Sequence, residues 1–163
     1  MLAAVLMLAT PALAVSPAYT PKAIAPAMPG GDSQLVKGAC TPKSHTASGG
    51  LKEDIRGKHT AFLCDSVIVT FLDNQRKHVL VQFTLQNSRS ARVIGFEGVV
   101  EGGEGVFRVR QMFLERGKTF AADDGGCRIS YSGRTPNALA CGASMHQEKS
   151  RTVAIVEFKA AAR

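Results

Sequence analysis

The sequence predicts an all-β fold, a small antiparallel sandwich or barrel of about seven or eight strands with an irregular N-terminal extension. From residue 60 onward, β-branched and aromatic residues recur in short runs separated by Gly, Asn, Asp and Ser. No stretch of about 11 residues has the amphipathic period of a helix. The length of 163 residues and the 45% share of hydrophobic residues fit a single ordinary domain.

The strands are expected where side chains alternate between apolar and polar. The clearest case is residues 78–85, in which Val79, Val81 and Phe83 lie on one face of an extended chain. Turns rich in Asp, Asn and Gly separate such runs into hairpins. The predicted strands are 62–72, 78–85, 92–100, 106–114, 127–131, 138–142 and 152–158, with turns at 73–77 and 101–105.

Residues 1–14 have the features of an export signal. The stretch 2–9 is apolar, Pro11 interrupts it, and Ala12 and Ala14 form the small-residue pattern that signal peptidases recognise. The apolar run is much shorter than the roughly 20 residues needed to cross a bilayer. We therefore expect a soluble mature chain that acts in the periplasm or outside the cell; the alternative is a buried N-terminal helix.

Residues 15–59 differ in composition from the rest of the chain. The stretch 15–31 holds four prolines and a Gly-Gly pair, with few large apolar side chains. The stretch 32–59 is polar and has at most one short helical turn near residues 51–56. We expect a flexible leader followed by an irregular segment, and a disulfide-stapled β domain over residues 60–163.

The four cysteines are expected to form two disulfides, because an oxidising compartment turns an even cysteine count into a disulfide framework. Cys127 and Cys141 flank a turn-like stretch centred on Arg134, and a hairpin folded there places them directly opposite each other. By elimination, Cys40 pairs with Cys64. The alternative is a zinc site, but its cysteine pairs lie about two to four residues apart, and these lie much further apart.

The glycine-rich turn at 101–105 suggests a candidate interaction patch. Pairing the strands outward from this turn places Arg108 opposite Gly98 and Arg110 opposite Phe96 on one face, and the opposite face is expected to meet the core. The guanidinium groups of Arg108 and Arg110 would then stack on the ring of Phe96 or bind an anionic partner. The alternative is that the arginines extend along a sheet edge, and a shift of one residue would reverse the faces.

The sequence predicts no catalytic residue and no cofactor, since it lacks the motifs of common hydrolases, zinc enzymes and nucleotide-binding proteins. Residues 125–129, Gly-Gly-Cys-Arg-Ile, resemble the catalytic cysteine segment of L,D-transpeptidases, exported enzymes that crosslink peptidoglycan. The resemblance implies Cys127 as a thiolate nucleophile with a histidine upstream. Residues 110–113, where that histidine should lie, contain none, and Cys141 competes for the same sulfur.

A second resemblance concerns Phe62-Leu63-Cys64. This Phe-x-Cys segment is similar to the first strand region of C-type lysozyme inhibitors, which are small exported β-barrels. The resemblance implies inhibition of a secreted hydrolase. Lysozyme is basic, however, and a net charge of +7 on this chain opposes long-range attraction between the two.

No metal site is predicted. Asp123 and Asp124 precede a glycine pair but lack the alternating spacing of a calcium loop, so we expect a solvated turn. Met145 next to His146 could suggest copper capture, but a single histidine on an exposed strand or loop is more often an ordinary surface residue. The histidines are scattered along the sequence and are expected to be ordinary surface residues: His45, His59, His78 and His146.

The excess of 20 Lys and Arg over 13 Asp and Glu indicates an anionic partner rather than nucleic acid, because no basic run exceeds two residues and no aromatic platform accompanies it. We expect an exported, non-catalytic domain that binds an anionic envelope component or a protein partner. The alternatives are a small cell-envelope enzyme, hydrolytic or peptidoglycan-modifying, and an inhibitor of a secreted hydrolase.

Overall fold

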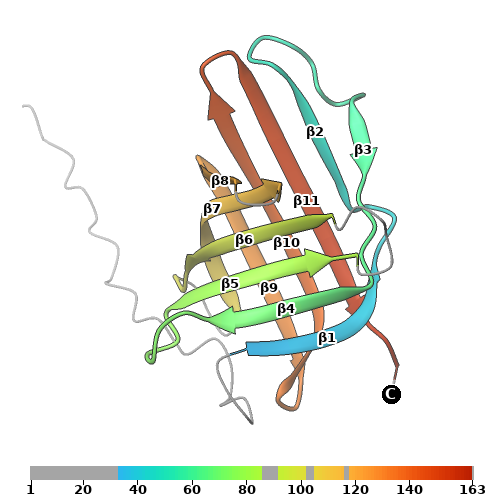
Figure 1. Cartoon of the computed structure of the whole chain (residues 1–163), viewed down its shortest axis with the longest axis vertical. Helices are drawn as coiled ribbons and strands as arrows, with labels where there is room; N and C mark the ends of the chain where they lie inside the picture. Colours follow the sequence, from blue (N-terminus) through green and yellow to red (C-terminus); the bar gives the residue numbers. More distant parts are fainter. Residues whose placement is uncertain (1–32, 86–91, 102–104, 116–117, 163) are drawn as a thin grey trace, which may run out of the picture.

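The computed structural model describes residues 33–85, 92–101, 105–115 and 118–162, and their regular structure is all β-strand (Figure 1). This confirms the predicted fold class. These residues include no helix with the length and hydrophobicity needed to cross a membrane. The strands are β1 (Ser33–Cys40), β2 (His45–Gly50), β3 (His59–Ala61), β4 (Ser66–Phe71), β5 (His78–Thr84), β6 (Val93–Val99), β7 (Val106–Glu115), β8 (Lys118–Ala121), β9 (Asp124–Ser132), β10 (Thr135–Gln147) and β11 (Ser150–Ala160).

The strands form one antiparallel sheet that closes on itself. Its order is β1-β4-β5-β6-β7-β9-β10-β11, and β11 returns to β1 by pairing Phe158–Ala160 with Gly38–Cys40. β2 and β3 extend the sheet beyond β11, and β8 lies beside β7. Of the two architectures the sequence allowed, the pairing therefore selects a closed barrel rather than a sandwich with open edges.

The strands form two layers, in which β4, β5 and β6 cross over β9, β10 and β11 (Figure 1). Aromatic side chains from the two layers meet between them: the rings of Phe83 on β5 and Phe158 on β11 have centroids 6.3 Å apart. Phe96 on β6 lies 6.1 Å from Phe83 in an edge-to-face arrangement. The core therefore lies inside the ring of strands and draws on both layers.

The strands with a strict period of two are where the sequence predicts them. On β5, Val79, Val81 and Phe83 are completely buried, and they alternate with residues that reach the outer surface. Burying one such side chain contributes roughly 1.5–3 kcal/mol to folding. This alternation therefore fixes which face of the hairpin β4–β5 meets the core.

Residues 33–61 correct the expectation of an irregular segment up to residue 59, because they form β1, β2 and β3. Only Val36 in β1 and Ala47 in β2 are buried, and all of β3 is exposed. The hydrophobic alternation that marks a strand in the sequence is therefore missing. These strands are held by their main-chain pairing with β11 and β4.

The hairpin β6–β7 has a bulge that changes the predicted register. Gly98 lies opposite Val109, whereas Glu97 lies opposite Gln111, so Arg110 is an extra residue on β7. On the turn side of this bulge the pairing already differs by one residue from the prediction, since Arg108 faces Val99 rather than Gly98. Because the extra residue reverses the alternation along β7, Phe107 and Val109 point into the core before the bulge and Met112 does so after it.

Both predicted disulfides are present, Cys40–Cys64 and Cys127–Cys141. Cys127 lies directly opposite Cys141 in the β9–β10 hairpin, with their Cα atoms 4.1 Å apart. The chain reverses at Gly133, whose φ of 62° is in the left-handed region. An irregularity between Pro136 and Ala138 then restores the register that aligns the two cysteines.

Candidate functional site

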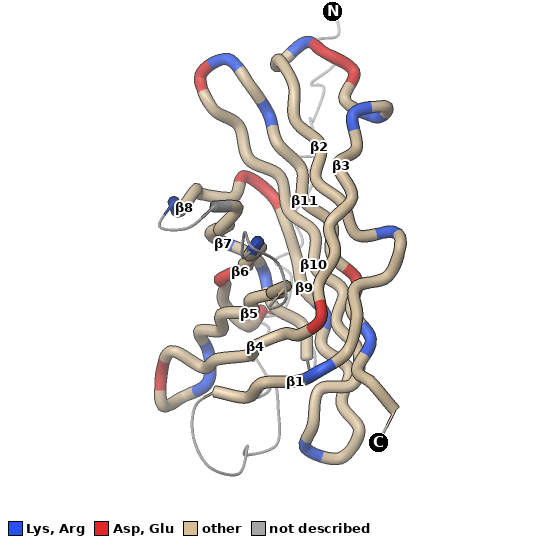
Figure 2. The backbone as a smooth tube through the Cα atoms, turned by 45° about the vertical axis from the view of Figure 1, so that its right-hand side comes forward, with Lys and Arg blue, Asp and Glu red and all other residues tan. Residues whose placement is uncertain are grey.

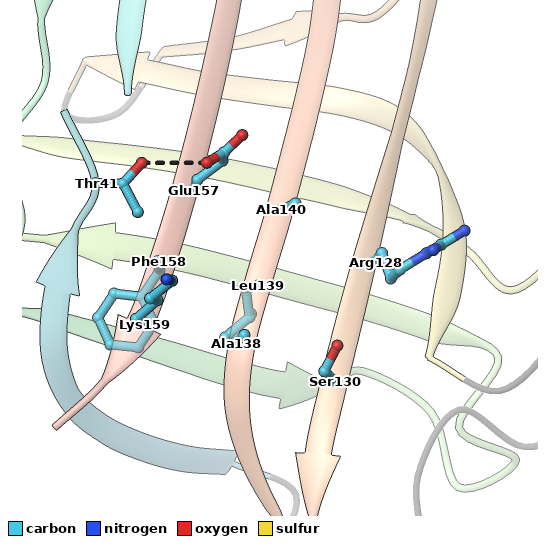
Figure 3. A pocket seen from close by; sticks show the side chains of 9 residues that line it. All are labelled: Thr41, Arg128, Ser130, Ala138, Leu139, Ala140, Glu157, Phe158 and Lys159. Atoms are coloured by element: carbon cyan, nitrogen blue, oxygen red, sulfur yellow. Dashed lines mark hydrogen bonds between the residues drawn. The ribbon is translucent and has the colours of Figure 1, made fainter. Parts of the chain in front are cut away.

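The outer face of β9, β10 and β11 carries a shallow depression of about 170 Å³ (Figure 3). Its centre is low because β10 presents only alanines there, while the neighbouring strands present longer side chains. Leu139 and Phe158 lie beneath this surface and belong to the core. The lining residues are Thr41, Arg128, Ser130, Ala138, Leu139, Ala140, Glu157, Phe158 and Lys159.

Strand register places the lining residues in two parallel rows. Directly opposed residues of antiparallel strands point to the same face of the sheet, and each alanine of β10 has one partner on β9 and one on β11. The arrangement is therefore fixed by the backbone and does not depend on loops. The rows are Arg128–Ala140–Glu157 and Ser130–Ala138–Lys159.

The depression has a basic group on each side. Figure 3 shows Arg128 on one side of the alanines, and Glu157 and Lys159 on the other. Arg128 and Lys159 are exposed, and within the described part of the chain neither forms an ion pair. The carboxylate of Glu157 accepts a hydrogen bond of 3.2 Å from the Thr41 hydroxyl. The surface therefore offers two unpaired cations to an anionic group.

Further shallow depressions adjoin this one at the same end of the barrel. One of about 490 Å³ shares Arg128 and Ser130 with it, and one of about 500 Å³ shares Ala138 and Lys159. A fourth, of about 220 Å³, continues from Thr135 toward β1. Together they make an open, uneven surface around the β9–β10 turn, which suits an extended chain better than an enclosed small molecule.

The predicted patch of Phe96, Arg108 and Arg110 does not form. Phe96 is completely buried inside the barrel, while both arginines are exposed on its outer face. The carboxylate of Glu101 lies 2.7 Å from the Arg110 guanidinium and 3.7 Å from that of Arg108. The prediction is wrong because the pairing on the turn side of the bulge is already shifted by one residue, which places Arg108 and Phe96 on opposite faces.

The cysteine segment that resembles L,D-transpeptidases is part of the structural framework. Cys127 is 3% exposed and its sulfur is bonded to Cys141. All four cysteines of the sequence are in disulfides. The segment therefore supplies no thiolate nucleophile in this structure.

Two of the four histidines are paired with carboxylates. His146 Nδ1 lies 2.7 Å from Asp123 Oδ2, and the same oxygen accepts the His146 main-chain N–H. His78 Nδ1 lies 3.2 Å from Asp73 Oδ2. Asp123 therefore ties the β8–β9 connection to β10. In the described ranges, no group of three or more His, Cys, Asp or Glu side chains is arranged to hold a metal ion.

The remaining two histidines, His45 and His59, are adjacent in space although 14 positions separate them, and their ring centroids lie 4.3 Å apart. Sequence reasoning missed this pair because β2 and β3 were not predicted. Elsewhere the basic residues are spread over the molecule, as Figure 2 shows for both of its ends. This agrees with the scattered charge of the sequence.

Comparisons with protein-family models, with curated proteins and with solved structures found no match to this chain. The residues of the depression were also missed by sequence reasoning. Their signal is the stretch Ala138–Gly142, in which small residues alternate with Leu139 and Cys141. Such alternation predicts a strand with a flat outer face but gives no indication of the neighbours that surround it.

Proposed function

We propose that this protein is an exported, non-catalytic binding domain that holds an anionic partner, an envelope component or an acidic protein, on the outer face of β9, β10 and β11. Two disulfides and the absence of a membrane-spanning helix among the described residues are consistent with an oxidising compartment. The export signal at residues 1–14 lies outside the described residues and remains part of the proposal.

The observation that supports an anionic partner is the contrast between two pairs of basic residues. Arg128 and Lys159 flank a floor of alanines, and among the described residues neither forms an ion pair, with Glu157 of the same depression included. Arg108 and Arg110 share the carboxylate of Glu101. A guanidinium or ammonium group that is already paired gains less from a second anion, so the first pair is the better binding element.

The alternative of a thiol-dependent envelope enzyme has no support, because all four cysteines are in disulfides. No described contact favours the alternative of a hydrolase inhibitor. An open surface on a rigid sheet, with charges at its border, is typical of recognition by complementarity. Such a surface binds an extended anionic chain without a catalytic group.

The test compares two double variants that lose the same net charge. Arg128→Gln with Lys159→Gln removes the unpaired cations, and Arg108→Gln with Arg110→Gln removes the paired ones. Binding of poly-L-glutamate and of phosphatidylglycerol vesicles is measured at low and moderate salt. We expect the first variant to weaken binding about thirtyfold, since it removes two charge-assisted contacts worth about 1 kcal/mol each. Equal losses in both variants would contradict the proposed surface.

A further inference from the structure

His45 and His59 lie on the same face of the sheet, on neighbouring strands. His45 of β2 is opposite Ala61 of β3, and His59 of β3 is opposite Ala47 of β2, so the two histidines are diagonal neighbours. Their rings are 4.3 Å apart at an interplanar angle of 60°. His45 is partly exposed and His59 is exposed, which leaves both imidazoles accessible from solvent.

Each of these imidazoles uses one nitrogen for a main-chain carbonyl. His45 Nδ1 donates to the carbonyl oxygen of Lys43 at 2.7 Å, and His59 Nε2 donates to that of Arg56. In a neutral imidazole the other nitrogen then carries the lone pair. The free nitrogens are Nε2 of His45 and Nδ1 of His59. Histidines that bind metals have this arrangement, since the outer hydrogen bond fixes the tautomer and orients the ring.

The carbonyl that orients His59 belongs to a well-anchored loop. Ile55, next to Arg56, is 5% exposed and packs over Gly49, where a Cβ would lie 2.7 Å from the Ile55 side chain. Glu53 accepts the Gly50 N–H at 2.9 Å through its carboxylate. The loop is therefore fixed on β2 before any ligand arrives, which reduces the ordering cost of binding.

The charges near the pair are mostly compensated. Asp54 forms an ion pair of 2.9 Å with Arg56, and Glu53 forms one with Lys58. Two of the three basic residues of this loop, Arg56 and Lys58, therefore have carboxylate partners, which reduces their repulsion of an incoming cation. His78 and His146 differ from the pair in that each is alone with a carboxylate.

We propose that His45 and His59 form a surface site for one divalent late transition-metal ion, with Cu²⁺ bound more tightly than Ni²⁺ or Zn²⁺. Imidazole nitrogens suit all three ions. For a given nitrogen site, the affinity for Cu²⁺ exceeds the affinities for Ni²⁺ and Zn²⁺. The described residues supply two ligands, so water completes the coordination.

The experiment titrates the full chain with Cu²⁺ by calorimetry, with electron paramagnetic resonance to count the bound nitrogens. We expect one equivalent of copper with two imidazole nitrogens. His45→Ala and His59→Ala should each weaken binding tenfold or more, since even loss of an outer-shell partner costs about 10–100-fold. His78→Ala and His146→Ala are the matched controls and should change the affinity less than about twofold, because those rings lie outside the site.

A second measurement does not depend on the variants being folded. In the wild-type chain, one equivalent of Zn²⁺ should shift the ring resonances of His45 and His59 together in NMR spectra and leave His146 in place. The proposal is overturned if His45→Ala and His59→Ala bind copper as the wild type does, or if zinc shifts only His78 or His146. Both results are independent of anion binding at Arg128 and Lys159.

Discussion

The hydroxyl of Ser44 makes two hydrogen bonds with the main chain of Glu157. It donates to the Glu157 carbonyl oxygen and accepts the Glu157 N–H, each at 3.0 Å. β11 pairs with β2 before this position and with β1 after it, and the chain turns between the two at Thr41 to Ser44. The Glu157 carbonyl oxygen also accepts the Thr41 N–H at 2.7 Å, so the Ser44 side chain supplies the partner for the Glu157 N–H that the neighbouring main chain does not. Ser44 is 1% exposed, so water does not compete for these bonds.

Replacing this hydroxyl should destabilise the fold. Ser44→Ala leaves the Glu157 N–H buried without its partner, which costs about 1–3 kcal/mol. We expect a lower midpoint of urea unfolding with an unchanged slope. Ser48→Ala is the control, because its hydroxyl contacts Thr152 on an exposed surface and its loss should change stability by less than about 0.5 kcal/mol. Equal effects of both substitutions would show that the Ser44 contacts carry no special weight.

Two glycines should respond differently to a methyl group. A Cβ at Gly98 would lie 1.9 Å from the Arg108 carbonyl oxygen, beside the bulge of β7, whereas a Cβ at Gly126 would meet nothing closer than 3.7 Å. Gly98→Ala should therefore cost at least about 1–3 kcal/mol through overpacking. Gly126→Ala should leave stability unchanged or raise it slightly. Thermal unfolding of the two variants measures the difference, and a tolerated Gly98→Ala would argue against the bulged register.

The disulfide across β9 and β10 should contribute measurably to stability. Its loop of 14 positions corresponds to about 3 kcal/mol in the chain-entropy description. The variant Cys127→Ala with Cys141→Ala should lose about that much free energy of unfolding. Chemical denaturation provides the measurement. Thiol titration of the native wild-type chain is the accompanying check, and a reactive thiol would contradict the pairing of all four cysteines.

The Asp73 carboxylate should make stability depend on pH in the acidic range. Burial opposes its ionisation, but the N–H groups of Lys77 and His78, at 2.8 and 3.0 Å, together with the charge of His78, outweigh burial and hold the pKa of Asp73 below its ordinary value. A lowered folded-state pKa gives a contribution that is complete above the unfolded-state pKa and is lost as the pH falls through the folded-state pKa.

Asp73→Asn should therefore be less stable than the wild type near pH 7, and the gap should close as the pH falls below about 4. Urea midpoints between pH 7 and pH 2 measure it. Asp124→Asn is a suitable control, because Asp124 is exposed at the start of β9. A gap that stays constant with pH would refute the role given to the Asp73 carboxylate.

The sequence was sufficient for the parts of the fold in which burial and alternation coincide. Val79, Val81 and Phe83 identified β5 because each is a large side chain on a half-buried strand. The pairing of Cys127 with Cys141 followed from the position of the turn between them. Both inferences depend on residues that are close in sequence, so the local sequence pattern was enough to predict them.

The parts that failed depend on partners far away along the chain. β2, with the sequence HTASGG, has one buried residue, and its strand form comes from pairing with β11 about 100 positions later. A shift of one residue at the turn end of the β6–β7 pairing was enough to misplace Phe96 relative to Arg108. Neither the depression around Ala140 nor the contact of His45 with His59 could be inferred before these pairings were known.

The pairing of β1 with β11 requires the C-terminal strand to be present before the barrel can close. β1 pairs with β11 only at residues 158–160. The ring of strands therefore cannot close until this last stretch of the chain is present. A chain truncated before β11 would leave β1 and β10 as unpaired edge strands. Both edges could then pair with strands of other molecules. The interior is therefore shielded only once β11 is present, so we expect the ring to close after β11 has been synthesised.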